Sequence, residues 1–251
     1  MSRATAVTIT NQKGGVGKTT IAIHLAFALK QTGKRVCLVD LDTQGNASAI
    51  LSRDPRINMS DGGAEALFYP DRDITPKETP SGIDLLHGHL NLERVDKEVT
   101  TSSAATLRDR VHALDYDFIV FDTPPSLGVR QLAALVWADI AAIPTKPAPM
   151  DIQGTASTIR VVKRLVESRQ NPSLRWKIIL NMVMANSREQ NKVIEKIRKQ
   201  FPTNLVQFTF GQRVGLSDCL AIGQPIWEFK GAPREVADAW RSLPASLGLG
   251  E

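Results

Sequence analysis

The sequence predicts an α/β fold, with a doubly wound and mostly parallel sheet flanked by helices. Seven short apolar runs alternate with segments of helical spacing, and strict strand–helix alternation favours a parallel sheet covered on both faces. A glycine-rich loop joins the first run to the first helix, as in many phosphate-binding sheets. The length of 251 residues and the 42% hydrophobic content fit one globular domain over residues 1–251.

The predicted strands are the apolar runs, at 4–10, 35–41, 83–86, 118–121, 140–144, 177–182 and 205–210. Apolar residues recur at helical spacing between them, which predicts helices at 18–31, 104–114, 126–137, 153–168 and 187–201. Residues 53–80 are rich in Asp, Pro and Gly and only weakly periodic. We therefore expect a long surface excursion there.

Several protein classes are disfavoured by composition. Cys37 and Cys219 show no C-x-x-C spacing, which fits a reducing cytoplasm. No apolar stretch approaches the roughly 18 residues of a membrane span, and the first residues lack a signal-peptide pattern. His87 and His89 have no third ligand nearby in the sequence, so a transition-metal centre is not expected. We expect a cytoplasmic protein without a membrane partner.

The most specific motif is NQKGGVGKTT at residues 11–20, directly after the first predicted strand. Its glycines let successive N–H groups face inward, and the helix that follows adds partial positive charge at its N-terminus. Lys18 can reach the β- and γ-phosphates of a nucleotide, and the Thr19 hydroxyl can bind Mg²⁺. The ordinary P-loop pattern would place a glycine at Gln12, whereas this sequence carries an extra lysine, Lys13.

Two acidic segments follow predicted strands. Asp40 and Asp42 end the run at 35–41, and Asp122 follows the run at 118–121. Ligands of open parallel sheets bind at the carboxyl ends of strands, so these acids should lie near the glycine-rich loop. Asp122 has the sequence context of a Walker B aspartate, which holds Mg²⁺ through water. Of Asp40 and Asp42, one can orient the attacking water while the other supports Mg²⁺ or the loop.

These motifs resemble the ParA family of deviant Walker A P-loop ATPases, and the resemblance covers nearly the whole chain. KGGVGKTT at 13–20 follows the signature K-G-G-x-G-K-[ST]-T, and DLDTQGN at 40–46 follows D-x-D-P-Q-G-N. Thr43 stands where the family usually has proline, which should loosen the turn while leaving both aspartates in place. The resemblance implies ATP and Mg²⁺ as cofactors and an ATP-dependent homodimer.

The resemblance also implies residue roles. Lys13 would cross the dimer to the partner's phosphates, Asp42 would position the hydrolytic water, and Asp122 would be the Walker B acid. A cation reaching the phosphates from outside the loop would act much as an arginine finger does. Mg²⁺ would be held by Thr19, Asp40 and Asp122. The nucleotide would be held by Gly14, Gly15, Val16, Gly17, Lys18, Thr19, Thr20, Asn181 and Gln212.

The net charge of +5 is unevenly distributed. Residues 160–200 contain 11 basic and three acidic residues, a balance of +8, while the other 210 residues carry −3. In the predicted helix at 187–201, the basic residues that share one face are Arg188, Lys192, Lys196 and Lys199. With Arg160, Lys163 and Arg164 they could follow a phosphate backbone without base readout, and Arg213 is a further candidate. A solvated helix face laced with Glu189 and Glu195 is the plainer interpretation.

The family resemblance implies a partition ATPase whose ATP-bound dimer binds DNA non-specifically at the nucleoid. A ParB-like partner would stimulate hydrolysis and release. Two alternatives stay open, a MinD-like ATPase cycling on membranes and a ParA-like ATPase that positions a protein cargo. Residues 232–247 have core spacing and few basic residues, which disfavours an interfacial anchor. An electron-transfer ATPase would need two suitably placed cysteines per subunit, and Cys37 lies within an apolar run.

Overall fold

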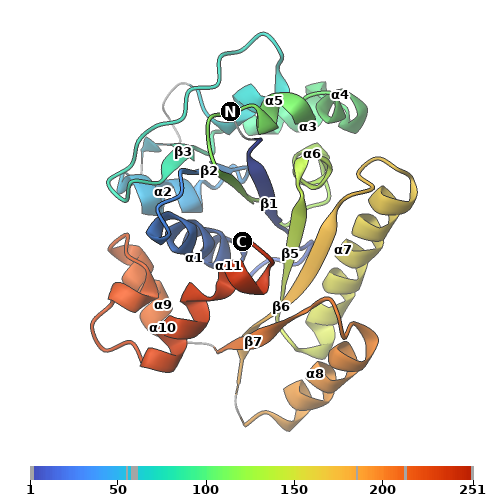
Figure 1. The fold of residues 1–251 in the computed structure, drawn as a ribbon. Helices are drawn as coiled ribbons and strands as arrows, with labels where there is room; N and C mark the ends of the chain where they lie inside the picture. Colours follow the sequence, from blue (N-terminus) through green and yellow to red (C-terminus); the bar gives the residue numbers. More distant parts are fainter. Residues whose placement is uncertain (1–2, 55, 58–61, 185, 212–213, 250–251) are drawn as a thin grey trace.

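The computed structural model of the chain describes residues 3–54, 56–57, 62–184, 186–211 and 214–249 (Figure 1). Its strands are β1 (Thr5–Ile9), β2 (Val36–Asp40), β3 (Asp84–Leu86), β4 (Phe118–Asp122), β5 (Ile140–Thr145), β6 (Arg175–Val183) and β7 (Leu205–Gly211). They form one sheet in the order β3-β2-β4-β1-β5-β6-β7, and each neighbouring pair is parallel. The predicted fold class is confirmed.

Helices cover both faces of this sheet. The α-helices are α1 (Lys18–Gln31), α2 (Asn46–Ser52), α3 (Leu92–Glu98), α4 (Thr101–Ala105), α5 (Arg108–His112), α6 (Val129–Trp137), α7 (Pro149–Glu167), α8 (Arg188–Gln200), α9 (Val214–Ala221), α10 (Arg234–Arg241) and α11 (Leu243–Ser246). Short 3₁₀ helices are η2 (Ala64–Phe68) and η3 (Ile226–Glu228). One apolar core lies under α1, α2 and α9–α11, and the other under η2, α3 and α6–α8.

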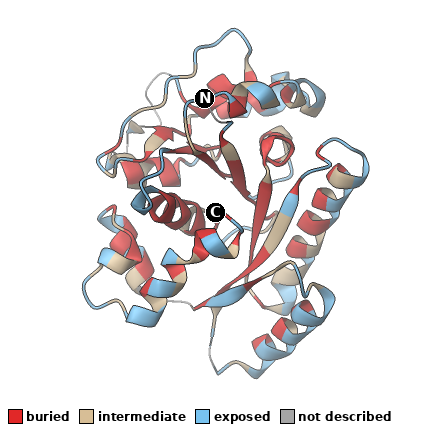
Figure 2. Cartoon of the chain, viewed as in Figure 1, coloured by how far each residue is buried: buried red, intermediate tan, exposed pale blue. Residues whose placement is uncertain are grey.

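The strands supply both cores because their side chains alternate between the faces. Val7 and Ile9 of β1 enter the core under α1, while Ala6 enters the opposite core. Every residue of β2, β4 and β5 is buried (Figure 2). Strands covered on both faces read as continuous apolar runs, which is why the sequence pattern located them.

The single helix predicted at 104–114 is wrong. Two short helices, α4 and α5, occupy this region with a break at Thr106 and Leu107. Thr100 and Ser103 form a capping box that starts α4 three residues earlier, at Thr101. The Thr106 hydroxyl then donates to the Ser103 carbonyl oxygen at 2.8 Å. Such local side-chain bonds compete with continued helix.

The surface excursion predicted for residues 53–80 is only partly correct. The helix η2 lies inside it, and all five of its residues are buried. Phe68 packs on Trp137 with ring centroids 5.0 Å apart, so this segment contributes to a core. A run of five residues is too short to show helical periodicity.

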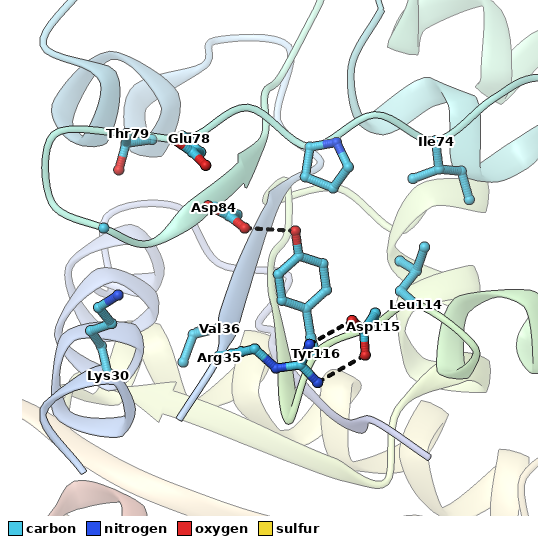
Figure 3. Close-up of a pocket in the computed structure, with 12 residues that line it drawn as sticks. Lys30, Arg35, Val36, Ile74, Glu78, Thr79, Asp84, Leu114, Asp115 and Tyr116 are labelled. Atoms are coloured by element: carbon cyan, nitrogen blue, oxygen red, sulfur yellow. Dashed lines mark hydrogen bonds and ion pairs between the residues drawn. The ribbon is translucent and has the colours of Figure 1, made fainter. Parts of the chain in front are cut away.

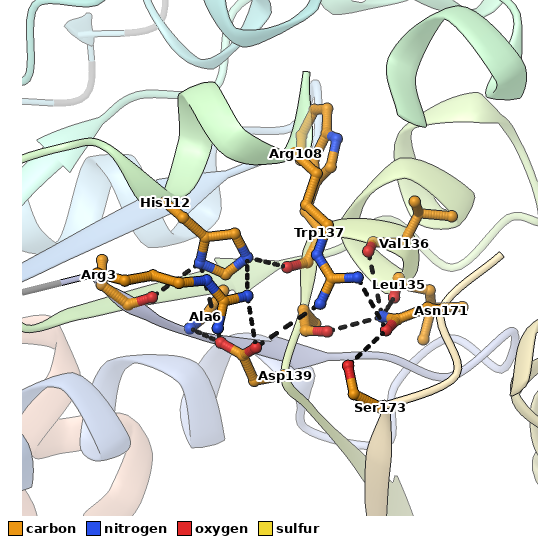
Figure 4. Close-up of polar contacts among 12 residues, drawn as sticks. Arg3, Ala6, Arg108, His112, Leu135, Val136, Trp137, Asp139, Asn171 and Ser173 are labelled. Carbon is orange, nitrogen blue, oxygen red and sulfur yellow. Dashed lines mark hydrogen bonds and ion pairs between the residues drawn. The ribbon is translucent and has the colours of Figure 1, made fainter. Parts of the chain in front are cut away.

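A polar cluster holds the amino ends of β1 and β5 together (Figure 4). The Asp139 carboxylate accepts from the Ala6 amide at 2.9 Å and pairs with Arg3 at 2.9 Å. Arg108 lies 3.7 Å from the same carboxylate and donates to Asn171 at 3.1 Å. These contacts stabilise the end of the sheet opposite the glycine-rich loop.

Candidate functional site

The glycine-rich loop connects the carboxyl end of β1 to the first turn of α1. Gly15 and Gly17 have φ of 70° and 89°, a backbone conformation that side chains other than glycine rarely adopt. Gly17 also has no room for a side chain, because a Cβ there would lie 2.3 Å from the Asn181 Nδ2 atom. The loop therefore leads through two left-handed glycines directly into α1, at whose N-terminus an anion is favoured.

Lys18 and Thr19 occupy the first turn of α1. The Lys18 ammonium donates to the carbonyl oxygen of Lys13 at 3.1 Å, which closes the loop. Burial lowers the pKa of Lys18, and the charges of Asp122 and Asp42 oppose that shift. The Thr19 side chain hydrogen-bonds to the Asp122 carboxyl group and lowers its pKa. The predicted lysine, threonine and Walker B acid are thus brought together.

The Asp40 and Asp122 carboxylates are buried at the ends of neighbouring strands. Asp40 Oδ2 accepts from the Ser48 amide and hydroxyl at 2.9 and 2.7 Å, and Oδ1 accepts from the Asp42 amide at 3.1 Å. Burial is the main cause that raises the pKa of Asp40 to about 6. Burial, followed by repulsion from Asp40, raises the pKa of Asp122 well above its usual range.

The donor set around Asp122 fits Mg²⁺. Asp122 Oδ1 is buried and has no hydrogen-bond partner among the described residues, and the Thr19 hydroxyl lies beside the same carboxyl group. Mg²⁺ is usually held by one or two carboxylates together with nucleotide phosphates and water. No cluster of three or more His, Cys, Asp or Glu side chains suited to a metal occurs in the described ranges. Asp40, by contrast, already accepts three internal hydrogen bonds.

Asp42 lies in a tight turn that leads from β2 into α2. The turn is closed by the Gly45 amide, which donates to the Asp42 carbonyl oxygen at 3.0 Å. Gly45 has φ of 62°, and the Gln44 amide donates to the Asp42 carboxylate at 3.1 Å. The turn therefore closes with Thr43 in place of the usual proline, and the Asp42 side chain stays half-buried.

Lys13 projects from the glycine-rich loop, as expected. Its ammonium lies 3.4 Å from the Asp151 carboxylate in the first turn of α7, and 44% of its side chain is exposed. A Cβ at Gly154 would lie 2.9 Å from the Lys13 Cβ, so α7 approaches the loop closely. The sequence reasoning missed this Asp151 contact.

Two threonines of α7 extend that contact. The Asn11 amide group donates to Thr155 at 3.1 Å, and the Gln12 backbone amide donates to Thr158 at 3.1 Å. With Asp151, these threonines lie at i, i+4 and i+7 and so share one helix face. That spacing was the available sequence signal for a polar face directed at the loop, and it was overlooked.

Of the residues predicted to lie beside the adenine base, the structure describes Asn181. Asn181 is buried at 3% exposure, and its Nδ2 donates to the Val16 carbonyl oxygen at 2.8 Å. The amide group therefore holds the glycine-rich loop, and its contact with adenine stays a prediction. Gln212 and Arg213 lie outside the described residues.

The basic face of α8 forms as predicted. Arg188, Lys192, Lys196 and Lys199 are all exposed, whereas Ile194 and Ile197 are buried on the other side of the helix. On α7, Arg160 and Lys163 are exposed, and the Lys163 ammonium lies 5.9 Å from the centroid of the Phe201 ring. The two helices lie side by side (Figure 1).

A cavity of about 580 Å³ lies away from this site, at the start of β2 and β3 (Figure 3). Its walls carry internal pairs: the Arg35 guanidinium binds Asp115 at 2.6 Å, and the Tyr116 hydroxyl donates to Asp84 at 2.8 Å. None of the predicted site residues lines this cavity. The predicted nucleotide site therefore lies at the opposite end of the sheet.

The parallel sheet, the glycine-rich loop and the buried aspartates define a P-loop nucleotide-binding protein. Residues 4–176 match the AAA_31 family model, described as an AAA domain. The chain is 33% identical to the sporulation initiation inhibitor protein Soj of Bacillus subtilis, covering 88% of this chain and 89% of Soj. It is 32% identical to the chromosome partitioning protein ParA of Myxococcus xanthus, covering 88% and 80%. The chain belongs to the ParA family of P-loop partition ATPases.

Protein IncC of Escherichia coli is 34% identical over 92% of this chain, which spans 65% of the length of IncC. Among solved structures, apo McdA of Cyanothece superposes with a TM-score of 0.85 at 19% identity, covering 98% of this chain and 100% of McdA. A plasmid partition protein of Borrelia burgdorferi bound to AMPPNP gives 0.78 at 24% identity, covering 98% and 99%. These two similarities establish the shared fold.

Within the described ranges, every helix is too short or too polar to span a lipid bilayer.

Proposed function

We propose that residues 1–251 form one ATPase domain that hydrolyses ATP with Mg²⁺ and uses the cycle to bind and release DNA. The observation that carries the hydrolytic part is the buried Oδ1 of Asp122, which has no partner among the described residues and lies by Lys18 and Thr19. An unpaired buried carboxylate oxygen is costly to the folded chain. Its position at the phosphate loop supports a function in holding a cation.

In this proposal different residues of the chain bind the phosphates, hold the metal ion and orient the water. The loop amides and Lys18 bind the β- and γ-phosphates, while Thr19 and Asp122 hold Mg²⁺. Bound Mg²⁺ supplies neutralising charge to the phosphate oxygens. Asp42 accepts a hydrogen bond from the attacking water and orients it in line with the γ-phosphate. Asp40 supports this arrangement from β2, by holding the Asp42 amide or by joining the metal site.

Dimerisation completes the proposed site. Lys13 reaches outward from its loop, and among the described residues its ammonium is tied only to Asp151, by an ion pair with partial exposure. An exposed pair of this kind contributes little stability, so the ammonium can leave it when a better anion is offered. The phosphates of a nucleotide on a second copy of this chain are such an anion. Asn181 and Gln212 complete the nucleotide site in this proposal.

DNA is the proposed surface on which the dimer acts. The cations of α7 and α8 stand on exposed faces, and residues 160–200 carry +8. A surface of that charge binds phosphate backbones without sequence preference and with strong salt dependence. Arg213 would extend it. The proposed location is therefore the nucleoid in the cytoplasm, with a ParB-like partner stimulating hydrolysis and release.

The apolar side chains of α10 and α11 are packed in the core and do not form a lipid-binding face. Trp240 of α10 and Leu243 of α11 are 1% and 0% exposed and belong to the core under α1. Their apolar surface is not available to lipid, and an interfacial helix needs such a face. A protein cargo carried on DNA would use the same surfaces as a DNA cargo, so both remain within the proposal.

Co-sedimentation of the full chain with DNA and with anionic liposomes, each with ATP, ADP or no nucleotide, tests this proposal. Retention on DNA with ATP alone, lost as salt is raised, is the expected result. Retention on liposomes with ATP and none on DNA would replace the DNA function with the membrane alternative. Equal DNA retention under all three nucleotide conditions would remove the link to the ATP cycle.

A further inference from the structure

We propose that Arg130 is a positioning residue for hydrolysis, acting on Asp42 through the backbone of Leu41. Arg130 lies in the first turn of α6 and is 7% exposed. Its Nη1 donates to the Leu41 carbonyl oxygen at 2.8 Å. Leu41 immediately precedes Asp42, so this bond fixes the peptide group that presents the Asp42 carboxylate. The inference rests on the proposed function of Asp42 in orienting water.

The Arg130 guanidinium is itself held by α3. Its Nε and Nη2 lie 3.0 and 2.8 Å from the same oxygen of Asp96, Oδ2. The third nitrogen is thereby directed at Leu41, because the guanidinium is planar and its donors have a fixed geometry. Asp96 is seated against Gly128, where an added Cβ would lie 3.0 Å from its Oδ1. The pair is thus oriented as well as charge-neutral.

The remaining contacts of this segment restrain it from the other sides. The Leu41 amide donates to the Asp122 carbonyl oxygen at 2.9 Å, and the Asp40 carboxylate accepts from the Asp42 amide. Gly88 packs so closely that a Cβ there would lie 2.4 Å from the Asp42 carbonyl oxygen. The Gly88 amide also donates to the Ser48 hydroxyl, which holds Asp40. Among these contacts, the hydrogen bond to the Leu41 carbonyl oxygen is the one that comes from α6, through Arg130.

This arrangement joins the two acidic segments of the site. The chain runs from Asp122 through residues 123–128 into α6, and Arg130 then returns to the segment that follows β2. Arg130 therefore adds a side-chain restraint on the position of Asp42 relative to Asp122, beside the backbone bond from the Leu41 amide to the Asp122 carbonyl oxygen. A catalytic group displaced by about 1 Å can cost about 100-fold in rate. The hydrogen bonds and ion pair of Arg130 within the described residues go to Asp96 and Leu41 and not to the glycine-rich loop, so nucleotide affinity should not depend on Arg130.

The test compares Arg130→Met with a matched variant, Arg108→Met. Methionine keeps the apolar stem in both variants, and both lose contacts with an aspartate whose side chain is partly exposed, 31% for Asp96 and 18% for Asp139. Arg108, however, lies in the cluster at the opposite end of the sheet. For Arg130→Met we expect kcat for MgATP hydrolysis to fall about 10- to 100-fold while the Kd for ATP changes less than about threefold. Arg108→Met should lose stability with kcat within about twofold of the parent.

Two further variants keep the test decisive if Arg130→Met folds poorly. Arg130→Lys retains the charge but cannot serve Asp96 and Leu41 together, so an intermediate kcat is expected. Asp96→Asn leaves the bond to Leu41 in place and should retain more activity than Arg130→Met. The inference is overturned if kcat of Arg130→Met falls no further than that of Arg108→Met, or if Arg130→Lys matches the parent.

Asp42→Ala separates this inference from the function on which it rests. Normal turnover in Asp42→Ala would remove the water-orienting function itself, whatever Arg130 does. Loss of turnover in Asp42→Ala together with normal turnover in Arg130→Met would remove the positioning inference alone.

Discussion

Asp40 and Asp122 are register partners on the adjacent parallel strands β2 and β4, and both carboxyl groups are buried. Burial raises both pKa values, that of Asp40 to about 6, and repulsion from Asp40 raises the pKa of Asp122 further. Three donated hydrogen bonds moderate the shift of Asp40, while Asp122 Oδ1 has none among the described residues. Without nucleotide, the site therefore carries an electrostatic cost that a cation would offset.

Replacing Asp122 by asparagine should stabilise the nucleotide-free protein and abolish hydrolysis. The substitution removes a buried charge that is repelled by Asp40, so we expect about 1 kcal/mol of added stability, or roughly 2–4 °C in Tm. Turnover should fall because the neutral amide is a poor Mg²⁺ ligand. Thermal unfolding and phosphate release measure the two effects. Asp71→Asn, at an exposed position, is the control and should change neither; a lower Tm for Asp122→Asn would contradict this account.

His24 should make the folded state sensitive to acid. Its Nδ1 donates to the Thr20 carbonyl oxygen and its Nε2 accepts from the Ile226 amide, while burial lowers its pKa from 6.5 to about 4. The unfolded chain binds the proton first as pH falls, so the stability from neutral His24 is complete above pH 6.5 and is lost as pH falls toward and through 4. The cost reaches about 2 kcal/mol at pH 5.

Urea unfolding of the parent and His24→Gln between pH 7 and 5 isolates this effect. Asp40 has the opposite effect to His24. Because its pKa is raised in the folded state, its protonation stabilises the folded state as pH falls from 6. It does so in both proteins and cancels in their difference. The stability difference between parent and variant should shrink toward pH 5. A constant difference would show that His24 does not titrate as described.

Lys13→Ala should separate nucleotide binding from dimer-dependent hydrolysis. The Lys13 side chain is partly exposed and pairs with Asp151, whereas its backbone carbonyl, which the variant keeps, binds Lys18. ATP affinity should therefore change less than about threefold, while ATP-dependent dimerisation or stimulated hydrolysis should be lost. Nucleotide titration and light scattering measure these separately. A variant that dimerises and hydrolyses normally would leave Lys13 without the function proposed for it.

Asn181→Ala should weaken ATP and GTP alike. The Asn181 amide group supports the glycine-rich loop through Val16, and loss of one buried hydrogen bond costs about 1 kcal/mol, or roughly fivefold in affinity. Both nucleotides use the same loop, so the loss should be equal. Titration with each nucleotide checks this. A loss confined to ATP would instead support the predicted contact between Asn181 and adenine.

Removing the cations of α8 should abolish DNA retention without changing ATP binding. In the triple variant Arg188→Ala, Lys192→Ala and Lys196→Ala, we expect the slope of log affinity against log salt to fall by about 1 to 3. The control removes three exposed cations elsewhere: Lys34, Lys230 and Arg234. Both variants change the net charge equally. Equal DNA retention in the two would show that general charge, and not the α8 face, binds DNA.

The strands were predictable because their signal is local. The strands β2, β4 and β5 are buried throughout, whereas β7 has three exposed residues. The observed strand ends differ from the prediction by at most two residues. The helix at 104–114 failed because a capping box and a threonine side-chain bond, at Thr100 and Thr106, override apolar spacing. The helices α2 and α3, seven residues each, are too short for a period of 3.6 to be visible.

In the candidate site, too, some residues were predictable from the sequence and others were not. Lys18, Thr19 and Asp122 stand in contiguous motifs with a known chemical reason for each residue, so the sequence located them. Their supports are contacts between distant segments, such as Gln12 with Thr158 and Arg130 with Leu41. No short-range pattern encodes which helix turn meets which loop. Tertiary packing determines these contacts, so they can be seen only in the folded structure.

The helix α7 connects the glycine-rich loop to two of the basic residues. Its first three turns hold the glycine-rich loop through Asp151, Thr155 and Thr158, and its later turns carry Arg160 and Lys163. The helix is an unbroken rod of 19 residues, about 28 Å long, so a tilt of about 5° at one end moves the other by about 2 Å. A shift of the loop on nucleotide binding would therefore also move Arg160 and Lys163, which follow Thr158 on the same helix.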